Sequence, residues 1–109
     1  MPYPRLDDDG QTVTLDLHGA RVAESLRLAA SVVVQAARHG RQTVRLVHGT
    51  STADRGAERT IKGALYDALD RGDFDRHVTS SFRQDGVLIL GIAPAPSPRT
   101  GRLKLADLR

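Results

Sequence analysis

The chain contains a stretch of alternating apolar and polar residues, Thr12-Val13-Thr14-Leu15-Asp16-Leu17, followed by His18-Gly19. Its apolar residues share one face of a β-strand, and its polar residues share the other. Alternation indicates a sheet covered on one face only, because strands buried on both faces are apolar throughout. The His-Gly pair ends the pattern and leads into a helical one.

After this strand, the chain alternates between helical and extended patterns. Val22, Leu26, Ala29, Val33 and Ala36 recur at spacings of three and four, which is typical of an amphipathic helix. The predicted elements are a strand over 12–17, a helix over 21–39, a strand over 43–47, a helix over 57–71, a strand within 74–83 on which Phe74, Val78 and Phe82 share a face, an Asp85-Gly86 hairpin turn, and a strand over 87–92.

This order, βαβαββ, predicts an α/β fold. Strand–helix–strand connections are right-handed and give parallel neighbours, and the closing hairpin adds an antiparallel pair. We therefore expect a two-layer sandwich, with a four-stranded mixed sheet and two helices on one face. Residues 1–11 are expected to form a flexible leader, 12–93 the domain, and 94–109 a basic, Pro/Arg-rich, disordered tail.

Composition excludes several classes of protein. The 109 residues include no Cys, which excludes disulfides, thiolate catalysis and cysteine zinc sites. No apolar run is long enough to span a bilayer, and no secretory signal is visible, so a cytoplasmic location is expected. Aromatic residues make up only 4%, which argues against a base-stacking platform. The net charge of +3 resides in the tail, although residues 38–62 are locally basic and suit an anionic partner.

The most informative feature is that two strands each end in His-Gly, at His18-Gly19 and His48-Gly49. If these strands are parallel, both turns lie at the sheet edge where α/β proteins bind ligands. Each turn precedes a helix, whose N-terminus favours phosphate. Asp16, two residues before His18, can orient an imidazole or share a metal with it. The alternative is that each histidine merely caps a turn.

These residues resemble a known family. Leu15-Asp16-Leu17-His18-Gly19, followed by Glu24 and later by Val44-Arg45-Leu46-Val47-His48-Gly49, looks like the Smr (small MutS-related) domain over about residues 12–93. The resemblance implies the two-layer βαβαββ fold of the C-terminal domain of translation initiation factor three. It also implies nucleic-acid binding and, as in several members, endonuclease (nicking) activity on DNA or RNA, with DNA repair as an associated process.

By position, Asp16, His18 and Gly19 match the first family motif, and His48 and Gly49 match the second. The second motif is usually His-Gly-x-Gly, whereas this chain has Thr50 and Ser51 after Gly49. The resemblance assigns catalysis to Asp16, His18 and His48. One histidine would act as general base, the other would protonate the leaving oxygen, and Asp16 would orient an imidazole. Nucleic-acid contacts are expected from Gly19, Arg45, Gly49, Thr50, Ser51, Arg55 and Arg59.

Two functional hypotheses stay open. The first is a nucleic-acid-binding Smr domain with endonuclease activity, for which a divalent metal such as magnesium is compatible but not required. The second is a non-catalytic module that binds nucleic acid or, through the tail, a protein partner. Thr50, Ser51 and the neutral body favour the second hypothesis. A small-molecule enzyme is disfavoured, because the sequence carries no cofactor motif.

Overall fold

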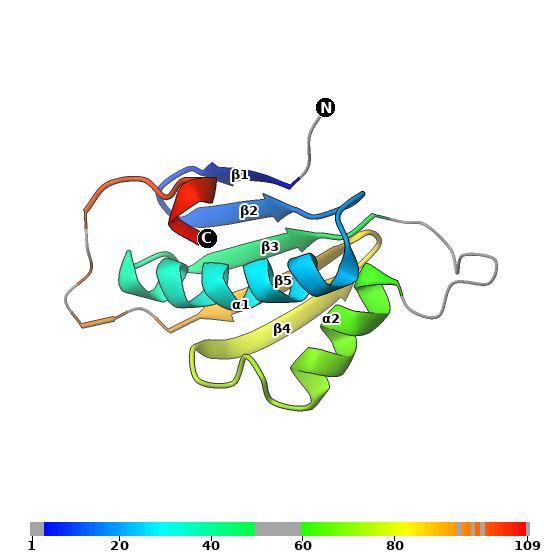
Figure 1. The fold of residues 1–109 in the computed structure, drawn as a ribbon. Helices are drawn as coiled ribbons and strands as arrows, with labels where there is room; N and C mark the ends of the chain where they lie inside the picture. The colour runs from blue at the N-terminus through cyan, green and yellow to red at the C-terminus, as the bar shows by residue number, and fades with distance from the viewer. Residues whose placement is uncertain (1–3, 50–59, 94, 97, 99, 109) are drawn as a thin grey trace.

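A computed structural model describes residues 4–49, 60–93, 95, 96, 98 and 100–108. These residues form one five-stranded sheet with two α-helices on one of its faces (Figure 1). The elements are β1 (Arg5–Asp8), β2 (Thr12–Asp16), α1 (Val22–Arg38), β3 (Thr43–Val47), α2 (Ile61–Asp70), β4 (Val78–Gln84), β5 (Val87–Ile92) and the short 3₁₀ helix η1 (Leu105–Leu108).

The strands lie in the order β1-β2-β3-β5-β4. Only β2 and β3 are parallel, and the other three neighbouring pairs are antiparallel. The two-layer α/β architecture is therefore as predicted, but the predicted four-stranded sheet and βαβαββ order are wrong. The additional strand is β1, which pairs with β2 from Arg5 opposite Asp16 to Asp8 opposite Val13.

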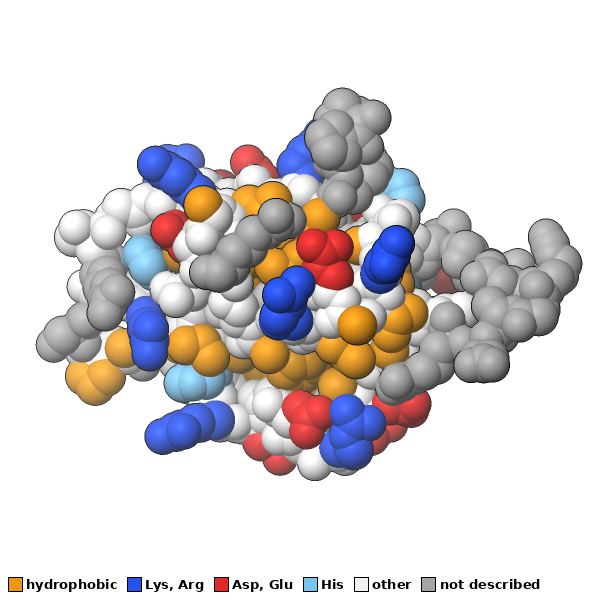
Figure 2. All heavy atoms as spheres, in the orientation of Figure 1, with side chains coloured by type: hydrophobic (Ala, Val, Ile, Leu, Met, Phe, Trp, Pro, Cys, Tyr) orange, Lys and Arg blue, Asp and Glu red, His pale blue; other side chains and the backbone are white. Residues whose placement is uncertain are grey.

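Alternation along the strands decides which face the helices cover. Val13 and Leu15 of β2 lie opposite Val44 and Leu46 of β3, and all four are fully buried. The same face continues onto β5 through Leu88 and Leu90, under α1 and α2. In Figure 2 a band of apolar side chains crosses the helical side where the two helices meet. No helix of the described residues covers the other sheet face, which we call the helix-free face (Figure 1).

The helices and the last hairpin follow the sequence patterns with small corrections. The helix predicted over 21–39 spans Val22–Arg38, and the residues of α1 that reach the core include Leu28, Val32 and Ala36. The Thr60 hydroxyl accepts a hydrogen bond from the Gly63 N–H, which fixes the start of α2. Residues 57–59 of the predicted second helix lie outside the described part of the chain.

The predicted shared face of Phe74, Val78 and Phe82 is wrong. Phe74 precedes β4 and is buried in the core, whereas Phe82 is 61% exposed. The neighbour of Phe82, Arg83, lies opposite the fully buried Leu88, so Phe82 points to the helix-free face. The period-of-four spacing of these three residues suits a helix as well as a strand, and the turn at Gly72 places Phe74 in a different element.

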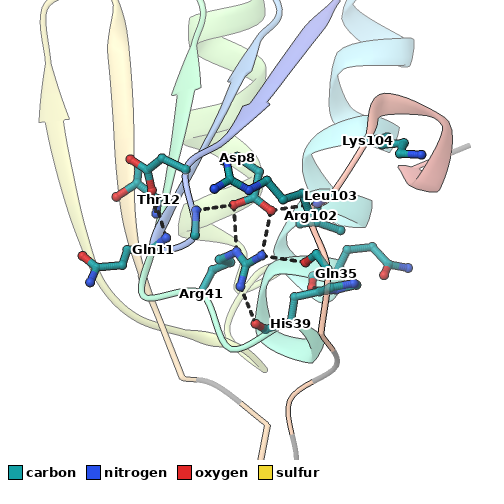
Figure 3. Close-up of polar contacts among 12 residues, drawn as sticks. Asp8, Gln11, Thr12, Gln35, His39, Arg41, Arg102, Leu103 and Lys104 are labelled. Carbon is teal, nitrogen blue, oxygen red and sulfur yellow. Dashed lines mark hydrogen bonds and ion pairs between the residues drawn. The ribbon is translucent and has the colours of Figure 1, made fainter.

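The two ends of the chain are tied together at the end of the sheet where β2 and β3 begin (Figure 3). Arg41 donates to both carboxylate oxygens of Asp8, at 2.7 and 2.9 Å, and also to the carbonyl of Gly101. The Leu103 N–H donates to the same Asp8 carboxylate at 2.7 Å. We call Asp8, Arg41 and the Gly101–Leu103 segment the terminal latch.

This arrangement differs from the expected flexible leader and disordered tail. Asp8 is only 6% exposed, and Leu103 and Leu108 are 4% and 5% exposed within the core cluster. A buried carboxylate is tolerated because it is paired and fully hydrogen-bonded. Since the described part of the tail packs on its own domain, the structure gives no support to a tail that reaches for a protein partner.

Candidate functional site

The two His-Gly turns lie side by side. β2 and β3 are parallel with Asp16 opposite Val47, and the Leu17 N–H continues the pairing by donating to the Val47 carbonyl at 2.8 Å. Gly49 has φ +91°, and a Cβ added to it would lie 3.3 Å from the Cβ of His18. The sequence expectation that both turns meet at one edge of the sheet is therefore met.

The glycine at position 49 is required by its place next to His18. A φ of +91° strains any L-side chain, and the space beside His18 leaves little room for one. The β4–β5 turn closes the same edge, because the Gly86 carbonyl accepts from the N–H groups of both His48 and Gly49. Three chain turns therefore converge here, after β2, after β3 and between β4 and β5.

His18 and Asp16 form a hydrogen-bonded pair at this edge. The distance between His18 Nδ1 and Asp16 Oδ1 is 2.9 Å, and the His18 backbone N–H also donates to Asp16 Oδ1 at 3.2 Å. A carboxylate can only accept, so Nδ1 carries the proton and the lone pair of the neutral ring lies on Nε2. The His18 side chain is 48% exposed and that of Asp16 21%. The pair therefore presents an oriented imidazole at the surface.

The orientation of Asp16 shows on which face of the sheet the His18 imidazole is open to a substrate. Its chain neighbours Leu15 and Leu17 are fully buried beneath the helices, so Asp16 points to the helix-free face. The hydrogen bond keeps the His18 ring beside it.

His48 is placed quite differently from His18. It is only 5% exposed, and its ring lies edge-on to Tyr66 of α2, with 5.9 Å between centroids. Its Nδ1–H donates to the carbonyl of Gly49 at 2.9 Å, and its Nε2 is buried with no hydrogen-bond partner among the described residues. Burial lowers the pKa of His48, the hydrogen bond to Gly49 partly offsets this, and the charge of Lys62 lowers it further. His48 is thus a buried, neutral imidazole on the helix side of its turn.

Two cations that lie against the Tyr66 ring, the ring on which His48 packs, were not predicted from the sequence. The Arg83 guanidinium lies 4.3 Å from the centre of the Tyr66 ring, and the Lys62 ammonium lies 5.8 Å from it. Arg83 also forms an exposed ion pair with Asp70 at 2.8 Å. The i,i+4 spacing of Lys62 and Tyr66 on α2 was the only available signal, since nothing local in the sequence brings Arg83 of β4 to the same ring.

The other expected contact residues fall into two groups. Gly19 forms the turn after β2 with φ +87°, and Arg45 is an exposed residue of β3, opposite Thr14 and Ile89 on the helix-free face. The remaining expected residues lie outside the described part of the chain; they are Thr50, Ser51, Arg55 and Arg59.

Comparison with known proteins agrees with this geometry. The model of the Smr domain family matches residues 15–87, a span that begins one residue before Asp16 and ends one residue after Gly86. The chain belongs to the Smr domain family. The crystal structure of the Smr domain of Thermus thermophilus MutS2 is similar to it, with 31% identity and a TM-score of 0.60 over 74% of this chain and 98% of that one. The comparison with curated proteins found no match.

The Smr family is associated with nucleic-acid binding and nicking. In this Smr domain, both family motifs and the β4–β5 turn lie at the same edge of the sheet. No group of three or more Asp, Glu or His side chains suited to a metal occurs among the described residues. In the same part of the chain, neither length nor hydropathy marks any helix as membrane-spanning.

Proposed function

We propose that this Smr domain binds nucleic acid and nicks DNA or RNA, with His18 as the proton-transfer residue. The observation that carries the proposal is the Asp16–His18 hydrogen bond at an exposed edge, beside the backbone turn at Gly49. Cytoplasmic location and a part in DNA repair belong to the same proposal.

The chemistry follows from the tautomer of His18. With Nδ1–H held by Asp16, the Nε2 lone pair can accept a proton from a water or from a ribose 2′-hydroxyl that attacks phosphorus. Asp16 stabilises the imidazolium that results and keeps the ring in place. The protonated ring can then donate to the leaving oxygen, so a single histidine completes the proton transfers.

In this mechanism His48 is a positioning residue. Its ring is buried against Tyr66, and its Nδ1–H is bonded to the Gly49 carbonyl, which supports the turn beside His18. We therefore propose His18 rather than His48 for both proton transfers. Arg45, Lys62 and Arg83 are cations of the described residues near this edge that suit phosphate. Arg55 and Arg59 stay proposed contacts.

Magnesium fits this site only in part. Asp16 supplies a carboxylate oxygen of the kind that magnesium prefers, and the ion usually takes few protein ligands alongside substrate phosphates. Bound there, it would polarise a phosphoryl oxygen. The roles of Asp16 and His18 as described do not depend on it.

Cleavage assays test the proposal directly. Purified protein is incubated with labelled single-stranded RNA, duplex DNA and supercoiled plasmid, with and without magnesium. We expect His18→Ala to lower the cleavage rate about 10²–10⁴-fold, and Asp16→Asn to lower it as well, while binding changes little. His77→Ala, a histidine that precedes β4, is the matched control and should cleave like the wild type. Unchanged cleavage in both site variants would refute the assignment.

The alternative is a binding module without cleavage. Thr50 and Ser51 replace residues of the usual His-Gly-x-Gly motif, in a loop expected to contact phosphate. Wild-type protein that binds the same probes but cleaves none of them would establish this alternative.

A further inference from the structure

We infer that the helix-free face of β3, β5 and β4 binds unpaired nucleotides, with one base stacked on Phe82 and a phosphate at Arg45. This inference rests on the proposed function and specifies the substrate as a single-stranded segment of DNA or RNA. The first observation behind it is one exposed aromatic ring, that of Phe82. Phe82 is the single large hydrophobic residue that stands exposed among the described residues, at 61%.

The register places Phe82 in a row of matching side chains. Phe82 of β4 lies opposite Ile89 of β5, Ile89 lies opposite Arg45 of β3, and Arg45 lies opposite Thr14 of β2. All four point to the helix-free face. The row therefore offers an aromatic ring, a half-buried aliphatic side chain and an exposed guanidinium in succession across three neighbouring strands.

This row leads directly to the proton-transfer pair. Asp16 lies two residues beyond Thr14 on the same strand and the same face, and it holds His18. Strands are about 4.8 Å apart, so Phe82 lies roughly 14 Å across the sheet from β2. A few nucleotides of one strand can therefore reach from His18 over Arg45 to Phe82.

The charges on the helix-free face indicate which β-strands the bound nucleic acid crosses. Toward β1, the same face carries two exposed side chains of opposite charge, Arg5 opposite Asp16 and Asp7 opposite Thr14, so β1 offers phosphate no net attraction. Toward β4, Arg45 is the single charged residue that β3, β5 and β4 direct to this face, and the others are apolar or neutral. The favourable path therefore crosses β3, β5 and β4.

The side chains around Phe82 on the helix-free face, which we call the Phe82 patch, suit nucleic-acid bases better than a protein partner. Its apolar part consists of Phe82 with the half-buried Val47, Val87 and Ile89, bordered by Thr43, Ser80 and Gln84. A stable protein interface buries about 800 Å² per partner, more than one ring with three half-covered aliphatic side chains presents. Stacking of one base on an aromatic ring needs little area and tolerates any base. Duplex bases are already stacked and cannot use Phe82.

Fluorescence anisotropy tests the inference with the wild type, four variants and three probes. The probes are a labelled 12-nucleotide single strand, prepared as DNA and as RNA, and a duplex of the same sequence. We expect the wild type to prefer the single strand. Phe82→Ala should weaken single-strand binding about 5- to 150-fold and leave duplex binding unchanged. Phe82→Trp should bind like the wild type. Ser81→Ala, on the same strand but the opposite face, is the matched control.

Phe82→Leu separates stacking from simple apolar contact. It keeps the cross-strand contact with Ile89 but lacks a ring, so it should bind as weakly as Phe82→Ala. Circular dichroism checks that each variant is folded.

Three results would overturn the inference. Phe82→Ala that binds the single strand as tightly as Ser81→Ala would remove the stacking site while leaving the proposed function intact. A wild type that forms dimers in sedimentation, which Phe82→Ala dissociates, would make the patch an interface between copies of this chain. A wild type that binds none of the probes would refute the proposed function together with the inference.

Discussion

Replacing Asp8 with Asn tests how much the terminal latch stabilises the domain. The substitution keeps the shape of the side chain but removes its charge. The Arg41 guanidinium, whose side chain is only 10% exposed, then lies without a counter-ion in the latch. Leu103 and Gly10 lose the charged acceptor of their N–H groups.

The expected loss of unfolding free energy follows from the pKa of Asp8. Burial alone would raise this pKa, but the hydrogen bonds from Arg41, Leu103 and Gly10, with the charge of Arg41, lower it from 3.8 to about 2. Each pKa unit corresponds to about 1.4 kcal/mol, so ionised Asp8 contributes about 2.5 kcal/mol to the free energy of unfolding. Leaving one member of a buried pair uncompensated costs about 3–5 kcal/mol. We expect Asp8→Asn to lower the free energy of unfolding by about 2.5–5 kcal/mol at pH 7.

The pH dependence of the free energy of unfolding gives a second measure of the contribution of ionised Asp8. Because the folded-state pKa is depressed, the stabilisation is complete above pH 4–5 and is lost as the pH falls from 3.8 through about 2. Asn does not titrate, so the difference in stability between wild type and Asp8→Asn should shrink by about 2 kcal/mol between pH 5 and pH 2, where Asp8 of the folded protein is half protonated.

Urea denaturation followed by circular dichroism measures both quantities. Asp7→Asn, an exposed residue of the same strand, is the control and should change stability by no more than about 0.5 kcal/mol. An Asp8→Asn variant that behaves like Asp7→Asn, or whose loss of stability is the same at every pH, would contradict the role assigned to the terminal latch.

Two further predictions concern the tail and the buried histidine. Leu103→Ala should lower the free energy of unfolding by about 2–5 kcal/mol in the same assay, because Leu103 is 4% exposed in the core; a loss of less than 0.5 kcal/mol would show that the tail is not docked. The wild type should lose thermal stability as the pH falls below 6.5, since burial depresses the pKa of His48 and the unfolded chain then takes up the proton first; His48→Gln should lack this part of the pH dependence, and identical profiles for the two proteins would contradict it.

The elements in the middle of the chain were predictable because local pattern and tertiary environment agree there. The alternation of Val13 and Leu15 and the apolar run from Val87 correspond to buried faces. Of the predicted helical stripe, Ala29, Val33 and Ala36 are buried, whereas Val22 and Leu26 are half-buried. β1 was not predictable, because Arg5-Leu6-Asp7-Asp8 is short and polar. Its stability comes from Arg41 and Leu103, which are far away in the sequence.

The sequence was enough to predict the motif residues of the site and their position at one edge of the sheet. The pairing of Asp16 with His18 and the meeting of the two His-Gly turns followed from spacing and from parallel strands. The burial of His48 did not, because it depends on the Tyr66 ring from α2. The exposure of Phe82 was hidden for a related reason. Aromatic residues are usually buried, and only the register of β4 against β5 shows which face it occupies.

The contact between Asp8 and Leu103 joins positions 95 residues apart. Closing so long a loop costs entropy before any contact forms, so such contacts are made late in folding. During synthesis the sheet from β1 to β5 emerges first, and the last residues arrive when the strands are already available for pairing. Changes in Gly101–Leu108 should therefore accelerate unfolding much more than they slow folding. The C-terminal segment would then govern the lifetime of the native state, and the central strands the speed at which it is reached.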